Sequence, residues 1–306
     1  MSKASNLEKL MELGLNVPYF RTLQSEDEVD LAISDIFLTD RVSVRSSGTI
    51  STPGRMNTYL DIKKEEISEY VKKVFNSGQS KRVREFLAQI NYAGLFQVEC
   101  IIQNYIPVIA PNDFSAVIHA RMNGDSTMQY ANVPGDQLMA GAVTPMEITL
   151  SRNLPIYSDI QKILKHFNCN QEIEITISDG TVYFLQTRNL KDTASETLED
   201  DIMVSGEHVT FAVYTIATDR VTGILTRDIN HACPSECLFL TDDTTFDDLE
   251  KLLKFKAILT TRGGSMCHTG AIARLFNKNV WLSIKDPTKL IDNMQYTCWM
   301  DGQLTK

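Results

Sequence analysis

The chain has 306 residues, of which 43% are hydrophobic and 23% charged, a balance typical of ordinary globular proteins in water. This length predicts about two domains, each with a core of its own. The formal net charge is −9, which argues against a large basic surface for nucleic acid, and no apolar run approaches the roughly 18 residues that a membrane-spanning helix needs. We therefore expect a cytoplasmic protein that binds neither nucleic acid nor membranes.

The N-terminal part of the sequence predicts helices around one short strand. Residues 5–15 carry leucines at helical spacing up to Gly14, and residues 42–46 form a short run of β-type residues. Residues 63–91 are charged and periodic, and an N-S-G-Q-S break at 76–80 divides them into two predicted helices.

From residue 95 onwards the pattern changes to strands. Residues 95–108, 113–122 and 126–133 are rich in β-forming residues and are separated by Pro, Asn-Asp and Asn-Gly turn signals. The clearest hairpin is E-I-E-I-T-I-S-D-G-T-V-Y-F-L-Q-T-R, residues 172–188, in which polar and apolar residues alternate before an Asp-Gly turn. These runs predict an α+β region that ends with the hairpin.

An acidic stretch rich in Ser and Thr, residues 192–201, is the predicted linker between two domains. The region before it, 1–191, is predicted to form two subdomains, about 1–92 and 93–191. The region after it, 202–306, alternates strand-like and helical runs and predicts a small α/β domain, so the expected fold class is α/β and α+β. The runs expected there are strands at 208–217, 236–240, 256–261 and 279–284, and helices at 244–255 and 269–276.

Six cysteines are scattered along the chain and are expected to stay reduced in a cytoplasmic protein. Cys233 and Cys237 form a C-x-x-x-C pair, and Cys267 stands next to His268, so a zinc site is one alternative. Structural zinc sites usually combine two close pairs of ligands, and the second pair is missing here. Free buried thiols are therefore the favoured interpretation.

A lone histidine, His268, stands at the tip of a glycine turn where a helix is predicted to begin. The stretch T-T-R-G-G-S-M-C-H-T-G-A-I-A-R runs from Thr260 to Arg274. A helix N-terminus has free backbone N–H groups and the positive end of the helix dipole, so it favours a bound anion and a neutral imidazole. Gly263 and Gly264 let the backbone approach a phosphate closely, and the two arginines of the stretch offer bidentate contacts. His268 is thus a candidate phosphate carrier; the alternative is a helix cap with an incidental histidine.

This stretch resembles the phosphohistidine motif of the phosphoenolpyruvate-utilising enzymes, the family of pyruvate phosphate dikinases, phosphoenolpyruvate synthases and rifampin phosphotransferases. Their pattern is close to T-x-R-G-G-x-x-[S/T/C]-H-x-A-I-x-A-R, and Gly270 stands here where alanine is usual. The resemblance implies that His268 is the catalytic residue, carried on a swivelling domain. The positions in step with the pattern are Thr260, Arg262, Gly263, Gly264, Cys267, His268, Ala271, Ile272, Ala273 and Arg274.

The first region resembles the nucleotide-binding part of the same enzymes, which has the ATP-grasp fold. S-K-A-S-N-L resembles a G-K-x-x-N-L motif whose lysine, here Lys3, meets the nucleotide phosphates, with Ser2 in place of the glycine. V-R-S-S-G-T-I-S-T-P-G-R-M-N-T-Y-L-D resembles V-R-S-x-x-x-x-S-x-P-G-x-M-D-T-x-L-N. This match implies that Arg45 is a catalytic, phosphate-binding arginine, and it places Asn57 at the usual aspartate.

Residues 172–188 resemble the hairpin D-I-E-F-x-I-x-D-G-x-L-Y-x-L-Q-x-R of the family. The resemblance implies that Glu174 and Gln186 hold Mg²⁺ and bind nucleotide, and that Arg188 reaches the transferred phosphoryl groups as a catalytic residue. A carboxylate and an amide oxygen suit a hard cation. Considered without the family, these side chains would form a solvated hairpin face with cross-strand pairs.

The segment before the hairpin resembles the family less closely. A-V-I-H-A-R resembles V-A-F-T-R and implies that Arg121 binds nucleotide. In V-P-G-D-Q-L-M-A-G-A-V-T-P, Gln137 replaces one of an acidic pair and Val143 replaces an arginine. We expect altered nucleotide contacts in this segment.

These resemblances imply an ATP-dependent phosphotransferase with ATP and Mg²⁺ as cofactors. In the family, the first half-reaction releases AMP and leaves a pyrophosphorylated histidine. The barrel that binds the acceptor in dikinases is expected to be absent, so the identity of the phosphate acceptor stays open. It could be a small molecule or a protein, and it could lie on a separate subunit. Two alternatives remain: a catalytically weak nucleotide-binding regulatory or sequestering protein, favoured by the departures at Ser2, Asn57, Gln137 and Val143, and an ATP-dependent ligase of the same fold.

Overall fold

The computed structural model describes residues 2–50, 56–89, 91–190, 207–245 and 248–306. The chain divides into two compact units. The first unit comprises residues 1–128, 132–135 and 148–190, and the second comprises residues 129–131, 136–147 and 191–306. The predicted linker, 192–201, lies outside the described residues. No described helix is both long and apolar enough to cross a membrane.

The elements up to Asn189 are the helices α1 (Lys3–Glu12), α2 (Val29–Ile33), α3 (Ile67–Gly78), α4 (Lys81–Gln89), α5 (Gly135–Ala140) and α6 (Tyr157–Phe167), the short 3₁₀ helices η1 (Glu26–Glu28) and η2 (Lys64–Glu66), and the strands β1 (Phe20–Leu23), β2 (Arg41–Gly48), β3 (Thr58–Lys63), β4 (Val98–Asn104), β5 (Phe114–Ala120), β6 (Thr127–Ala131), β7 (Met146–Thr149), β8 (Gln171–Ser178) and β9 (Thr181–Asn189).

The elements from His208 onwards are the strands β10 (His208–Ile216), β11 (Val221–Thr226), β12 (Cys237–Thr241), β13 (Ala257–Thr260), β14 (Val280–Ile284), β15 (Gln295–Cys298) and β16 (Gln303–Thr305), the helices α7 (Leu249–Leu252) and α8 (His268–Phe276), and the 3₁₀ helices η3 (Pro234–Glu236) and η5 (Pro287–Lys289). The expected α/β and α+β fold class is confirmed.

Helix α1 begins earlier than the sequence pattern predicted. Ser2 caps it, because its Oγ accepts a hydrogen bond from the backbone N–H of Ser5 at 3.2 Å. Lys3 therefore stands in the first turn of the helix rather than in a preceding loop. Gly14, with a φ of +74°, lies just beyond the helix end, a backbone conformation that glycine adopts easily.

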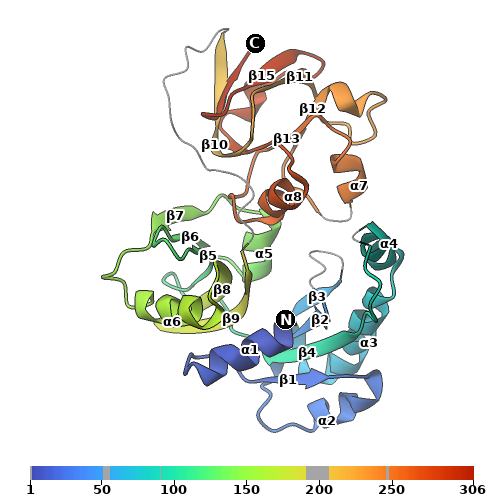
Figure 1. Ribbon diagram of the computed structural model, residues 1–306, viewed down its shortest axis with the longest axis vertical. Helices are drawn as coiled ribbons and strands as arrows, with labels where there is room; N and C mark the ends of the chain where they lie inside the picture. Colours follow the sequence, from blue (N-terminus) through green and yellow to red (C-terminus); the bar gives the residue numbers. More distant parts are fainter. Residues whose placement is uncertain (1, 51–55, 90, 191–206, 246–247) are drawn as a thin grey trace. The chain divides into compact units, whose positions relative to one another are not determined.

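The first sheet has the strand order β1-β4-β2-β3, and its neighbouring strands are antiparallel. Figure 1 shows α3 alongside this sheet. Ile67, Val71 and Val74 recur at helical spacing on α3 and are fully buried in one cluster with Val44 and Ile102. The predicted pair of helices in this region is confirmed as α3 and α4.

The second sheet has the order β7-β6-β5-β8-β9 and contains the predicted hairpin as β8 and β9. Asp179 and Gly180 both have positive φ, 50° and 71°, as the two central residues of a tight hairpin turn require. Helix α6, which was not among the predicted elements, contacts β8 and buries Ile160, Ile163 and Leu164.

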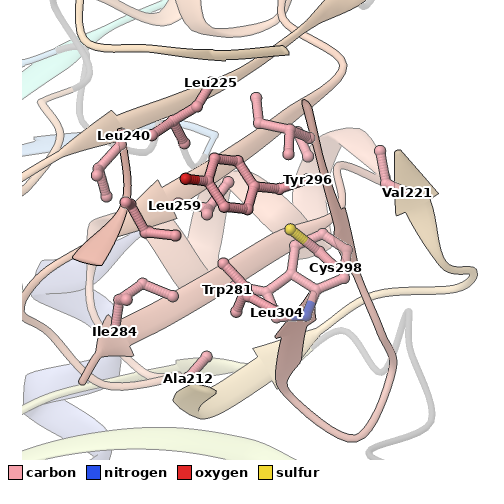
Figure 2. Close-up of a cluster of buried hydrophobic side chains, with 13 residues drawn as sticks. Ala212, Val221, Leu225, Leu240, Leu259, Trp281, Ile284, Tyr296, Cys298 and Leu304 are labelled. Carbon is pink, nitrogen blue, oxygen red and sulfur yellow. The ribbon is translucent and has the colours of Figure 1, made fainter. Parts of the chain in front are cut away.

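The strands of the second unit close into a barrel with the order β10-β14-β13-β12-β11-β15-β16. Neighbours from β11 through β12 and β13 to β14 are parallel, and the other pairs are antiparallel. Leu225, Leu259, Trp281, Tyr296 and Leu304 belong to the core cluster, and Figure 2 shows their side chains grouped in the interior. Burial of such large apolar side chains supplies most of the stability of a small barrel.

The predicted helix over residues 244–255 is wrong in length, because the described part of it forms only the short α7. Thr244 shares a hydrogen bond of 2.7 Å with the hydroxyl of Thr269, which ties the chain before α7 to α8. Phe255 lies in the core, its ring stacked on that of Phe239 with the centroids 4.7 Å apart. Tertiary contacts at both ends therefore override the helical pattern.

Candidate functional site

The carboxylate of Glu174, on β8, lies at the centre of a charged cluster in the first unit. Arg45 Nη2, from β2, lies 3.0 Å from Glu174 Oε2, and Arg45 Nη1 donates to the carbonyl oxygen of Leu185 at 3.0 Å. Gln186, opposite Glu174 on β9, donates from Nε2 to Glu174 Oε1 at 2.8 Å. The fold thus brings together three predicted site residues from distant parts of the chain.

Arg188 is held by a second carboxylate on the same face of the hairpin. Its Nε donates to Glu172 Oε1 at 2.7 Å, its Nη2 also contacts that oxygen, and the two residues are cross-strand neighbours. Burial by itself lowers the pKa of Arg188, but the carboxylates of Glu172 and Glu174 act in the opposite direction and raise the pKa above its ordinary value. Arg188 therefore stays charged, as the predicted phosphate contact requires.

Lys3 is close enough to this group for the neighbouring charges to change its pKa. The pKa of Lys3 is lowered to about 8, mainly by burial and also by the positive charges of Arg45 and Arg188, while Glu174 acts against the shift. The lysine also stands at the N-terminus of α1, where free N–H groups favour an anion. A bound phosphate would therefore favour the charged form of Lys3.

Together these side chains form what we call the Glu174 cluster: Lys3, Arg45, Glu172, Glu174, Gln186 and Arg188. Its three cationic side chains face two carboxylates, so the cluster has an excess of positive charge when all five are ionised. Such a partly buried group suits a polyanion, because charges attract more strongly where water is displaced.

Two members of the cluster fit the expected magnesium ion. The Glu174 carboxylate and the Gln186 amide are neighbours, and both residue types offer oxygen ligands. A cation bound by both would require the amide of Gln186 to present its oxygen instead of its NH₂ group. In the described part of the chain, no group of three or more His, Cys, Asp or Glu is arranged to hold a metal ion. The pair therefore fits a Mg²⁺ that takes most of its ligands from water and phosphate.

Two other positions from the family pattern, Arg121 and Asn57, have contacts near their own strands. Arg121 follows β5, and its backbone N–H donates to Ser126 Oγ at 3.0 Å in the turn before β6. Asn57, which replaces an aspartate of the family pattern, accepts from Arg82 Nη2 at 2.5 Å and donates to the Tyr59 hydroxyl at 2.6 Å. The side chain of Asn57 thus joins the start of β3 to α4.

In the second unit, His268 is the first residue of α8, as predicted, and its ring is partly exposed. Thr260 ends β13, and its hydroxyl donates to the carbonyl oxygen of Arg262 at 2.5 Å, which shapes the start of the turn. Gly263 has a φ of +94°, so a side chain there would strain the backbone. A Cβ at Gly264 would lie 2.3 Å from Gln129 Oε1 and 2.5 Å from Pro145 Cγ, so a larger residue there would displace these side chains.

The backbone of this loop is held by polar side chains of the second unit. Gln129 is buried; its Nε2 donates to Ser265 Oγ at 2.9 Å, and its Oε1 accepts from the N–H of Met266 at 3.0 Å. The hydroxyl of Ser283 donates to the Gly263 carbonyl oxygen at 2.7 Å. Gln129 and Ser283 were not predicted from the sequence, because neither belongs to the motif and both reach the loop through tertiary contacts.

The two arginines of the loop have different surroundings. Arg274 Nη1 donates to the Ser265 carbonyl oxygen at 2.7 Å and so supports the turn from within α8. Arg262 is exposed, and its Nη2 lies 3.6 Å and 3.5 Å from carboxylate oxygens of Asp242 and Asp243. Screened by water, such pairs are weak, so Arg262 can exchange them for another anion.

The six cysteines are free thiols, four of them buried. Cys267 precedes His268 and is buried as the N-cap residue of α8, without a side-chain capping bond. Cys237 Sγ lies 3.4 Å from His231 Nδ1, and Cys233 is exposed. Cys233, Cys237 and His231 thus lie around the short helix η3.

The loop and the part of the barrel from β12 to β15 match a family model described as the mobile domain of PEP-utilising enzymes, over residues 233–303. The matched residues include β13, α8 and His268. The resemblance to phosphoenolpyruvate-utilising enzymes that the sequence predicted is therefore confirmed.

Two curated relatives are both pyruvate, phosphate dikinases. The protein from Clostridium symbiosum is 29% identical over 187 residues, a match that covers 47% of this chain and 21% of the relative. The protein from Rhizobium meliloti (strain 1021) is 25% identical over 197 residues and is covered to 22%. The chain thus spans about a fifth of the length of these relatives.

Solved structures with partial similarity include an ADP complex of purK, N5-carboxyaminoimidazole ribonucleotide synthetase, with 11% identity, a TM-score of 0.39, and coverage of 65% of this chain and 47% of that chain. Another is a RimK domain protein ATP-grasp from Sphaerobacter thermophilus DSM 20745, with 14% identity, a TM-score of 0.37, and coverage of 62% and 59%.

Proposed function

We propose that the chain is an ATP-dependent phosphotransferase in which His268 takes a phosphoryl or pyrophosphoryl group from ATP and passes it to an acceptor. The observation that carries the proposal is the Glu174 cluster, whose predicted members come together from β2, β8, β9 and the start of α1. A solvated hairpin face would not require an arginine from another sheet to pair with Glu174. The matched mobile-domain segment around His268 is the second support.

The Glu174 cluster is the proposed site for the triphosphate. Lys3, Arg45 and Arg188 would contact phosphate oxygens and neutralise the charge that spreads over them during transfer. Glu174 and Gln186 would hold Mg²⁺, which supplies further positive charge when it is bound. The chain's own contribution is to keep these groups fixed before the reaction.

His268 is the proposed nucleophile. A lone pair on its neutral imidazole attacks a phosphorus of ATP, the N–P bond forms, and the bond from that phosphorus to the bridging oxygen breaks. The electron pair leaves with AMP if the β-phosphorus is attacked, or with ADP if the γ-phosphorus is attacked, and the imidazole proton passes to water. The N-terminus of α8 favours both the neutral imidazole before the step and the anionic product after it.

A regulatory or sequestering nucleotide-binding protein is the second candidate. Its support is the departure from the family pattern at Asn57, where an amide that bonds to Arg82 stands in place of the usual carboxylate. Such a protein would bind ATP at the Glu174 cluster without transferring a group to His268.

Product analysis with site variants separates these candidates. Purified protein is incubated with ATP and Mg²⁺, and AMP and ADP are quantified together with equilibrium ATP binding. The proposal predicts product from the wild type, loss of product in Glu174→Ala and Arg188→Ala, and retention in Thr181→Ala, an exposed position of the same hairpin. Binding without product would favour the second candidate, and a fully active Glu174→Ala variant would show that the site lies elsewhere.

A further inference from the structure

A buried histidine extends the Glu174 cluster across a third strand. His119 on β5 is paired with Glu172 on β8, and Glu172 is paired with Arg188 on β9, so the three residues form one row across neighbouring strands. His119 Nε2 lies 3.3 Å from Glu172 Oε2, within ion-pair distance but not aligned as a hydrogen bond. The other carboxylate oxygen, Oε1, accepts from Arg188.

The burial of this row limits the orientations that its side chains can adopt. The side chain of His119 is 1% exposed and that of Glu172 is 5% exposed. A carboxylate that is removed from water needs partners for its oxygens, and here Oε1 accepts from Arg188 while Oε2 faces the His119 ring. His119 and Arg188 therefore restrict the rotation of the carboxylate plane from opposite sides.

The orientation of the carboxylate decides the orientation of the guanidinium. Glu172 engages the Nε and Nη2 edge of Arg188, so the Nη1 corner points away from that contact. If the carboxylate turned, the guanidinium would turn with it, because the arginine is planar and its fork is rigid. A displacement of about 1 Å at such a group is enough to slow a positioned reaction by roughly 100-fold.

We propose that His119 is a positioning residue for phosphoryl transfer, acting through Glu172 to aim Arg188 at the phosphates. This inference rests on the proposed function of the Glu174 cluster. It requires the imidazole to carry a hydrogen on Nε2, since a carboxylate can only accept.

The first test uses no nucleotide. The chain has five histidines, so the imidazole signals of His119 can be assigned in ¹⁵N NMR spectra by comparison with His119→Gln. The Nε2–H form is expected, and both Glu172→Gln and Arg188→Gln should change the ring nitrogen shifts of His119. An Nδ1–H form, or shifts that ignore both variants, would overturn the inference.

The second test measures transfer. His119→Phe keeps the ring but removes both nitrogens, and His119→Gln restores an amide donor. We expect His119→Phe to slow the single-turnover labelling of the protein by ATP roughly 10- to 100-fold, the usual effect of losing an orienting partner. Affinity for ATP should stay within about 3-fold, and His119→Gln should recover most of the rate, because the effect acts on orientation and not on binding. His166→Phe, on the exposed side of α6, is the matched control.

The outcomes remain distinguishable. If His119→Phe reacts at the wild-type rate, or if His119→Gln is as slow as His119→Phe, the positioning role is refuted. If the wild type itself transfers nothing, the proposed function fails, and the NMR comparison still decides whether His119 is coupled to Arg188. Should His119→Phe fail to fold, His119→Gln and Glu172→Gln give the same comparisons.

Discussion

The ion pair between Arg45 and Glu174 should be worth a measurable coupling free energy. Its atoms are 3.0 Å apart, and the side chains are only 11% and 16% exposed. At an effective dielectric constant of about 20, unit charges at this distance attract by roughly 5 kcal/mol, and desolvation offsets part of that. We expect a coupling of about 2 kcal/mol, within the range found for residues in contact.

A double-mutant cycle measures this coupling. Arg45→Met and Glu174→Gln should each destabilise the first unit by about 3 kcal/mol, because each leaves a largely buried charge without its partner. The double variant should be less destabilised than the sum of the single variants by about 2 kcal/mol.

Urea unfolding followed by far-UV circular dichroism, with hydrogen exchange of β2 and β8 amides, reports the first unit. Both tryptophans, Trp281 and Trp299, lie in the second unit, so their fluorescence serves as an internal control that should not shift. Additive effects within about 0.5 kcal/mol would contradict the claim that these two residues meet.

Three further predictions concern the folded state. The pKa of Lys3 is lowered to about 8 from 10.5, so unfolding takes up a proton between these pH values and the free energy of unfolding should rise with pH across them. In urea unfolding at several pH values, Lys3→Met should flatten that rise, and an unchanged slope would contradict the pKa shift. Gly264→Ala places a Cβ 2.3 Å from a side-chain oxygen and should lower the free energy of unfolding by about 1–3 kcal/mol in thermal unfolding. The control Gly135→Ala, with its nearest contact at 3.6 Å, should be nearly neutral, and equal effects of the two variants would count against the tight turn. Leu259→Ala, in the barrel core, should lower the free energy of unfolding by about 3 kcal/mol. Leu275 is 40% exposed, so Leu275→Ala should lower it by less than about 0.5 kcal/mol. A small loss at Leu259 would show that the barrel interior is not packed as described.

Local patterns predicted the elements whose stabilising contacts are local. The hairpin over 172–188 was predictable because the alternation of residues 172–177 and the Asp-Gly turn are local signals. The register shift between Glu174 and Ile175 was not predicted. The helices α3 and α4 were predictable for the same reason, since their apolar residues recur at helical spacing. The motif around His268 placed the start of α8 correctly.

Features made by distant residues could not be predicted in this way. The closure of seven strands into a barrel depends on pairings such as β10 with β16, which no local window contains. The contact of Arg45 with Glu174 spans 129 positions, and that of Gln129 with Ser265 spans 136. Helix α6 did carry a signal, the spacing of its buried residues Ile160, Ile163 and Leu164, but the sequence analysis did not use it.

The most direct test of the account is the transfer of label from ATP to His268. Protein is incubated with Mg²⁺ and ATP labelled separately at the β and γ phosphates, beside His268→Ala and the matched control His208→Ala, whose histidine is exposed at the start of β10. The account predicts acid-labile, base-stable label on the wild type and on His208→Ala, with AMP if both phosphates are transferred, and no label on His268→Ala. Label that persists on His268→Ala, or its absence from all three proteins, would contradict the assignment of His268 as the phosphate carrier.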